Sequence, residues 1–170
     1  MSSQHIGTFM IAAAFALGIG LMTIFFGDVL DERRNPNQAP SSSTEGDDVV
    51  VTLTANAQHH YVTTGSINGQ SVEFLLDTGA TDVVVPEGIA RQLRLPRGMA
   101  GRAMTANGAV TVYATVLDSV AIGDMTLRNV SASINPAMDP GQVLLGMSAL
   151  SRVEFVQRGD SLTLRQTRRP

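Results

Sequence analysis

Asp77, Thr78 and Gly79 are the residues whose types and spacing are best suited to chemistry. They separate two short apolar runs, residues 74–76 and 83–85, whose composition is typical of buried strands. Asp77 is therefore expected on a tight turn, which Gly79 permits by tolerating positive φ. A carboxylate between apolar strands loses hydration and needs compensation. It either caps the turn through neighbouring backbone N–H groups, as is common in Asp-Gly turns, or it takes part in catalysis.

Other kinds of site find little support in the composition. The chain has no cysteine, which excludes a thiol nucleophile and a disulfide framework. His59 and His60 are neighbours in an expected strand, so they point to opposite faces, and no further ligand lies nearby; no metal site is predicted. No phosphate-binding loop precedes a helix, and no cofactor is predicted. The net charge of −3 favours no nucleic-acid partner.

The elements that position Asp77 are short strands joined by tight turns. Asn68-Gly69 lies between two strand-like segments, residues 61–67 and 71–76, and is a strong hairpin signal. Further turn signals are Asn107-Gly108, Gly123-Asp124 and Gly159-Asp160. Residues 87–93 and 147–150 are the helical segments. The pattern predicts an all-β, barrel-like fold of a single lobe with one or two short helices.

The N-terminal segment has a different character. Residues 6–26 carry no charge, and 21 residues at helical rise match a hydrocarbon core of about 30 Å. A cleaved signal peptide is the alternative, but no Lys or Arg precedes the apolar stretch. We expect residues 1–27 to form an uncleaved single-pass transmembrane anchor.

Residues 28–48 are rich in Ser, Pro and charge and poor in apolar side chains. Such a composition buries too little surface to offset its ordering entropy, which predicts a flexible linker. The folded domain is expected over residues 49–170.

Two motifs in this domain resemble a known family. Leu-Asp-Thr-Gly-Ala at residues 76–80 resembles the active-site signature of the aspartic proteases of the pepsin and retropepsin type. Val-Leu-Leu-Gly-Met at residues 143–147 is similar to the hydrophobic-hydrophobic-Gly element that follows the flap in each lobe of these enzymes. The likeness covers roughly residues 49–164 and is nearest to bacterial, membrane-anchored, retropepsin-like (clan AA) proteases. It implies a single-lobe acid-protease barrel.

Peptide hydrolysis by carboxylates needs two of them around one water, and the chain has one Asp-Thr-Gly. The second carboxylate must then be Asp77 of another copy, which a two-fold homodimer supplies. The resemblance implies that Asp77 is catalytic, that Thr78 ties the two turns together, and that Gly79 lets the substrate backbone approach. It also implies that a peptide or protein substrate contacts Ala80, Thr81, Asp82, Thr105, Ala106, Asn107, Gly108 and Leu145, with residues 105–110 acting as a flap. A catalytically inactive relative that binds a peptide by strand addition is the alternative.

The resemblance has local departures. Thr81 and Asp82 stand where many retroviral enzymes carry two acidic residues, and Met147 stands where they often have a basic one. Substrate main-chain contacts and dimer ion pairs at these positions are therefore expected to differ.

Two signals predict opposite membrane orientations. Arg33 and Arg34 follow the apolar stretch, and the positive-inside rule taken alone would leave the domain in the cytoplasm. The resemblance implies a periplasmic domain anchored in the bacterial inner membrane, and this is the orientation we expect.

Overall fold

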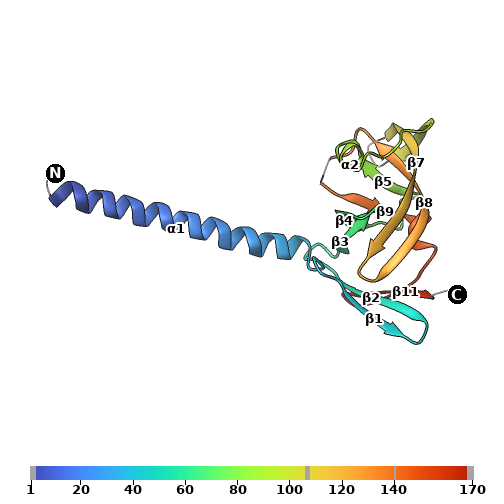
Figure 1. Cartoon of the computed structure of the whole chain (residues 1–170), viewed down its shortest axis with the longest axis horizontal. Helices are drawn as coiled ribbons and strands as arrows, with labels where there is room; N and C mark the ends of the chain where they lie inside the picture. Colours follow the sequence, from blue (N-terminus) through green and yellow to red (C-terminus); the bar gives the residue numbers. More distant parts are fainter. Residues whose placement is uncertain (1–2, 106–107, 140, 168–170) are drawn as a thin grey trace. The chain divides into compact units, whose positions relative to one another are not determined.

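The computed structural model describes residues 3–105, 108–139 and 141–167, and the chain divides into two compact units. The first unit ends at Arg34 and is the helix α1, Ser3–Arg34. The second unit begins at Asn35 and carries the strands and two short helices (Figure 1).

Helix α1 is apolar over most of its length. Its stretch Met10–Arg34 has a mean hydropathy of 2.1 and is long enough to cross a membrane. Most large apolar side chains from Met10 to Leu30 are more than half exposed. These properties fit a membrane anchor and a signal sequence alike. The predicted span lies inside this helix, which continues past the expected end of the anchor at residue 27.

The second unit contains a four-stranded antiparallel sheet in the order β1-β2-β11-β10. Its strands are β1 Ser41–Glu45, β2 Asp48–Thr54, β10 Glu154–Arg158 and β11 Ser161–Thr167. The first and last parts of this unit therefore meet in one sheet, and Figure 1 shows β1, β2 and β11 side by side.

A seven-stranded sheet forms the rest of the unit, in the order β3-β4-β9-β5-β8-β7-β6. Its strands are β3 Val62–Ile67, β4 Gln70–Leu76, β5 Val83–Pro86, β6 Ala100–Thr105, β7 Gly108–Ile122, β8 Met125–Asn135 and β9 Val143–Leu145. Pairing of β3 with β7 at Ser66↔Ala121 and Ile67↔Val120 closes the sheet into a barrel. The short helices are α2 Glu87–Gln92 and α3 Met147–Leu150. The predicted all-β barrel with two short helices is confirmed.

One hydrophobic core joins the two sheets. Ile67, Phe74 and Leu117 of the barrel strands are fully buried, and so is Leu53 of the four-stranded sheet. Burying each such side chain contributes roughly 1.5 to 3 kcal/mol. The core therefore fixes the barrel strands that carry the site.

The turns follow the predicted hairpin signals. Asn68 and Gly69 have φ values of 50° and 77°, the pair of positive φ angles that a type I′ hairpin requires. Hairpins also form at Gly123-Asp124 and Gly159-Asp160. At the expected Asn107-Gly108 hairpin, β6 pairs with β7, and residues 106–107 lie outside the described residues.

The segment predicted to be a flexible linker differs in the structure. Helix α1 takes its first residues, and β1 pairs with β2. Asn35 and Asn37 are buried at 3% and 4% exposure. The prediction of a flexible linker rested on the low apolar content of this segment. In the structure, amide side chains, and not apolar ones, attach it to the barrel.

Asn37 makes the main contacts of this segment. Its Nδ2 donates to the carbonyl oxygens of Thr54 (2.8 Å) and Val62 (2.7 Å), and its Oδ1 accepts from the Thr54 N–H (2.7 Å). Its backbone forms a bridge with Thr63. Asn37 thus links β2 to β3 across their connection.

We expect Asn37→Ala to lower the free energy of unfolding by roughly 2 to 4 kcal/mol, because three backbone groups lose a buried partner. Urea denaturation of a fragment that begins at Asn35 measures this change, with the exposed Gln38→Ala as the control. Equal midpoints for the two variants would contradict the role of Asn37.

Candidate active site

The turn that carries Asp77 is held by backbone on both sides. β4 runs parallel to β9, with Leu75 opposite Leu144 and Leu76 opposite Leu145. The Asp77 N–H donates to the Leu145 carbonyl (3.1 Å), and the Leu76 N–H donates to the Tyr61 carbonyl (3.0 Å). The point where β4 ends is therefore fixed before any ligand arrives.

Within the turn, the backbone also orients the carboxylate. The Gly79 N–H donates to Asp77 Oδ1 (2.9 Å), and the Ala80 N–H donates to the Asp77 carbonyl (3.2 Å). The expectation of a positive φ at Gly79 is wrong. Space is limiting instead, because a Cβ on Gly79 would lie 3.1 Å from Asp77 Oδ1. Such a contact is tighter than ordinary van der Waals packing, so an alanine here would push the carboxylate.

The second motif holds the chain just after the turn. The Met147 N–H donates to the Ala80 carbonyl and the Ser148 N–H to the Thr81 carbonyl, both at 2.8 Å. Ser148 Oγ accepts from the Val83 N–H (3.0 Å) and donates to the Ser131 carbonyl (2.7 Å). The start of α3 therefore clamps the residues that follow Asp77.

Gly146 is required at this contact. A Cβ on Gly146 would lie 2.1 Å from the Asp82 carbonyl oxygen and 2.7 Å from that of Ala80. Both neighbours are backbone atoms, which cannot rotate away. The Leu-Leu-Gly pattern is thus the partner of Asp-Thr-Gly in one structural unit.

Asp77 lies in a cleft of about 680 Å³. The turn supplies one side, through Asp77, Gly79, Ala80, Thr81 and Asp82. Strand β6 supplies another side, through Arg102, Ala103, Met104 and Thr105. Asp77 itself is partly buried, and Thr78 is exposed. The structure therefore brings Asp77 together with four of the predicted substrate contacts: Ala80, Thr81, Asp82 and Thr105.

Of the remaining predicted contacts, Leu145 and Gly108 do not line the cleft. The Leu145 side chain is 2% exposed and belongs to the core, while Leu144 lines the cleft. Because successive side chains of a strand point to opposite faces, only one of the two can face the cleft. The Gly108 carbonyl accepts a hydrogen bond from Thr105 Oγ1 (2.9 Å) at the last pair of β6 with β7. Ala106 and Asn107 lie outside the described residues.

Several lining residues were missed by sequence reasoning. Arg102 and Met104 reach the cleft from β6, and Ser133 and Asn135 from β8. The Met104 side chain is 83% exposed. Parallel pairing of β5 with β8, which sets Val84 opposite Ser133, brings β8 to the cleft. No local pattern indicates this pairing, because the two strands are far apart in the sequence.

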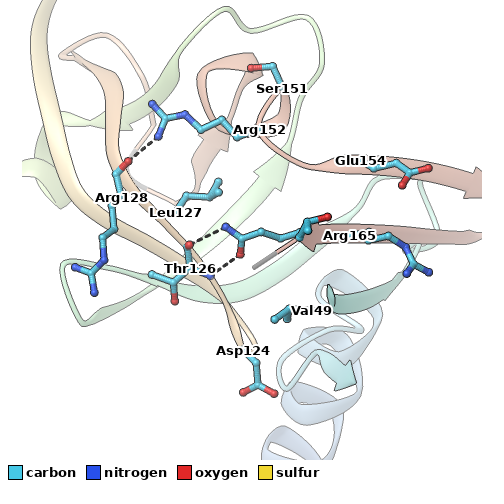
Figure 2. Close-up of a pocket in the computed structure, with 11 residues that line it drawn as sticks. Val49, Asp124, Thr126, Leu127, Arg128, Ser151, Arg152, Glu154 and Arg165 are labelled. Carbon is cyan, nitrogen blue, oxygen red and sulfur yellow. Dashed lines mark hydrogen bonds between the residues drawn. The ribbon is translucent and has the colours of Figure 1, made fainter. Parts of the chain in front are cut away.

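A larger hollow, of about 930 Å³, is lined by other residues and does not include Asp77. Figure 2 shows the side chains that line it. Two of its polar side chains already have protein partners: Gln166 exchanges two hydrogen bonds with the Thr126 backbone, and Arg152 donates to the carbonyls of Arg128 (2.6 Å) and Asn129 (2.9 Å). These contacts join β8 to β11 and to the end of α3. We therefore interpret the hollow as structural, and the Asp77 cleft as the candidate active site.

Among the described residues, no group of three His, Cys, Asp or Glu side chains is placed to hold a metal ion. The chemistry available at the cleft is that of a carboxylate acting on water. With one Asp77 per chain, a pair of such carboxylates requires a second chain.

Comparisons with known proteins agree with this geometry. Residues 63–152 match the family model described as "gag-polyprotein putative aspartyl protease". A curated relative from Sinorhizobium sp, described as an uncharacterized protein in the cobV 5′ region, is 34% identical over 128 residues, covering 73% of this chain and 54% of its own length. The chain thus spans about half the length of the curated relative that it matches.

Two solved structures are also similar. A retropepsin-like aspartic protease from Rickettsia conorii aligns with a TM-score of 0.57 and 26% identity, over 74% of this chain and 95% of its own. The EIAV protease in complex with the inhibitor HBY-793 aligns with a TM-score of 0.48 and 20% identity, over 58% of this chain and 92% of its own. The predicted retropepsin-like fold is confirmed by the first of these.

We expect Gly146→Ala to lower the free energy of unfolding by roughly 1 to 3 kcal/mol, because the added methyl displaces the backbone around Asp82. It should also displace the Asp77 turn. Urea denaturation measures the first effect, with Gly141→Ala as the control, because a Cβ there would meet nothing within 4 Å. An unchanged midpoint for Gly146→Ala would refute the clamp.

Proposed function

The chain belongs to the retropepsin-like aspartyl protease family, and on this premise we propose that it is a membrane-tethered, homodimeric aspartic endopeptidase. The observation that carries the proposal is the position of Asp77. Its carboxylate lies in the cleft, partly buried, with Oδ1 held by the Gly79 N–H. Each chain brings one such group, and each active site takes two.

The proposed reaction uses the two Asp77 carboxyls as one unit that shares a proton. The ionised carboxylate takes a proton from the water lying between them, and the water oxygen attacks the scissile carbonyl. The protonated carboxyl donates a hydrogen bond to the carbonyl oxygen as negative charge develops there. The C–N bond then breaks, and the leaving nitrogen takes up the proton that the first carboxylate removed from the water, which restores the ionised carboxylate. The Gly79 N–H keeps each carboxylate oriented throughout.

The substrate is a peptide in extended form. β6 pairs with β7 and is the last strand of its sheet, so a strand can lie between it and the Asp77 turn. Val84, Met104, Val112 and Leu144 give the cleft apolar walls. Apolar side chains on both sides of the scissile bond fit such walls. Thr78 of each subunit holds the partner's turn, and the β6–β7 hairpin acts as the flap over the peptide.

Helix α1 is the anchor in this proposal. A single apolar helix holds the protease domain at the bacterial inner membrane, with the domain in the periplasm. Confinement to a membrane raises the effective concentration of the subunits and favours their pairing.

Asp77→Asn should reduce peptide cleavage by roughly a thousandfold or more, since an amide cannot accept the proton from water. The full chain in detergent micelles, assayed against a broad peptide pool, provides the measurement. Asp118→Asn is the matched control, because Asp118 is an exposed carboxylate on β7. If the wild type cleaves nothing while dimeric, a peptide-binding role replaces the protease. Cleavage that survives in Asp77→Asn points to another catalytic group.

Subunit mixing tests the shared site. Wild-type chain is mixed with a threefold excess of Asp77→Asn chain and allowed to exchange partners. Random pairing should leave about one quarter of the original activity, because mixed dimers hold one Asp77. Activity that stays constant in the mixture would mean that each chain works alone.

A further inference from the structure

The cleft that holds Asp77 has two polar residues on its β8 side. Asn135 lines the cleft and is 8% exposed, and so is Ser133, two residues earlier on the same strand. Side chains two residues apart in a strand point to the same face. Because polar side chains that are nearly buried normally have hydrogen-bond partners, the groups that these two residues direct into the cleft require one.

The amide of Asn135 is held in one orientation by the chain. Its Oδ1 accepts from the Ala137 N–H (2.9 Å), which sets the oxygen toward that N–H and leaves the nitrogen for other partners. Neither the Asn135 Nδ2 nor the Ser133 hydroxyl has a hydrogen-bond partner among the described residues. An amide nitrogen carries two N–H donors. Asn135 therefore offers N–H donors to a ligand in the cleft.

Strand register places Arg102 on the other side of the same cleft. Extending the pairing of β7 with β8 by one residue sets Asn135 opposite Val112. Val112 in turn pairs with Gly101 of β6, the residue before Arg102, and both Arg102 and Val112 line the cleft. Two strand spacings of about 4.8 Å separate the backbones of β8 and β6. The long Arg102 side chain and one side chain of a ligand can fill this gap together.

Arg102 differs from the arginines that hold the fold together. Arg97 and Arg165 pair with carboxylates of the chain, and Arg152 donates to two backbone carbonyls. Arg102 makes no ion pair or hydrogen bond with any residue that the structure describes, and it is exposed. Its guanidinium is therefore available to a ligand.

Asp82, which also lines the cleft, lies at the opposite end of β5 from Asn135. Asp82 precedes Val83, the first residue of β5, whereas Asn135 pairs with Pro86, the last. Four residues of extended chain span about 13 Å, which is longer than the screening length at physiological salt. A negative charge placed beside Asn135 is therefore repelled only weakly by Asp82.

From this arrangement, we propose that Arg102 and Asn135 form a specificity subsite for an acidic side chain, Asp or Glu, of the peptide substrate. The substrate carboxylate accepts from the Arg102 guanidinium and from Asn135 Nδ2, and the Ser133 hydroxyl is a further donor. The acidic residue lies outside the pair that flanks the scissile bond, because Asn135 pairs with the end of β5 that is farther from the Asp77 turn. The inference rests on the proposed function and names the class of peptide that its cleft selects.

An acidic side chain fits these groups better than other side chains do. A Lys or Arg of the substrate would meet the Arg102 guanidinium and the donors of the Asn135 amide. An apolar side chain would cover that amide and leave its donors without a partner, which is unfavourable. A neutral Gln accepts the same hydrogen bonds but lacks the charge that makes such bonds strong. The comparison of Glu with Gln therefore isolates the charge.

Binding of labelled peptide pools to the full chain in detergent micelles tests the preference. Each pool consists of decapeptides with leucine at the two central positions and one outer position fixed as Glu, Gln or Lys. The other positions are randomised among uncharged residues. All binding measurements use the Asp77→Asn chain, because asparagine keeps the shape of the carboxyl and, under the proposed function, leaves the probe uncleaved. Fluorescence anisotropy measures the affinity.

We expect at least one outer position at which the Glu pool binds at least about fivefold more tightly than the Gln pool. Adding Arg102→Gln should abolish this ratio, and adding Arg102→Glu should make the Lys pool the tightest. Arg128→Gln is the matched control, because Arg128 is an exposed arginine of β8 that does not line the cleft. It should leave the ratio unchanged.

Asn135→Asp provides a second test in the same assay. The aspartate keeps an acceptor for the Ala137 N–H, but it sets a carboxylate where the amide donors were. The preference for Glu over Gln should disappear. A preference that survives in Arg102→Gln or in Asn135→Asp overturns the proposal. So does a chain that binds no Glu pool more tightly than the matching Gln pool, or that binds no pool at all.

These readouts measure the selectivity of binding and not cleavage, so the two proposals can fail separately. A preference for Glu that depends on Arg102, in a protein whose Asp77 form cleaves no peptide, leaves the subsite and removes the protease. Asp77-dependent cleavage without a preference for Glu leaves the protease and removes the subsite.

Discussion

The structure depends on the clamp between the Asp77 turn and the segment that joins β9 to α3. The Asp77 N–H bonds to the Leu145 carbonyl, and the N–H groups of Met147 and Ser148 bond to the carbonyls of Ala80 and Thr81. The clamp closes because Gly146 has no side chain at a contact where a Cβ would meet backbone at 2.1 Å. Two motifs far apart in the sequence thereby become one rigid support for a single carboxylate.

The clamp fixes where the carboxylate lies, and the barrel fixes what surrounds it. Parallel pairing of β4 with β9 and of β5 with β8 brings the ends of these strands to the cleft, opposite β6. In the proposed reaction, one chain supplies half of a carboxylate pair. The proposed reaction therefore requires two chains to associate. The surface that joins the two chains is then as important for the reaction as the residues of the cleft.

The four-stranded sheet joins the two ends of the folded unit. β1 and β2 come from the start of the folded unit, β10 and β11 from its end, and Leu53 and Leu164 pack this sheet against the barrel core. Its other face is polar, and its β10 edge is open.

The sequence by itself determined the parts governed by local chemistry. Asn68-Gly69 and the other turn signals set the hairpins, alternating short apolar runs set the strands, and an uncharged stretch set the long helix. Only the tertiary structure decided that Leu144, and not Leu145, lines the cleft, and that Arg102 reaches it. It also decided that Asn35 and Asn37 order a segment whose composition is typical of a flexible linker. Local propensities fix turns and strands, because they act between neighbours in the chain. The face that a side chain presents, and the partner that an amide finds, depend on strands brought together from distant positions.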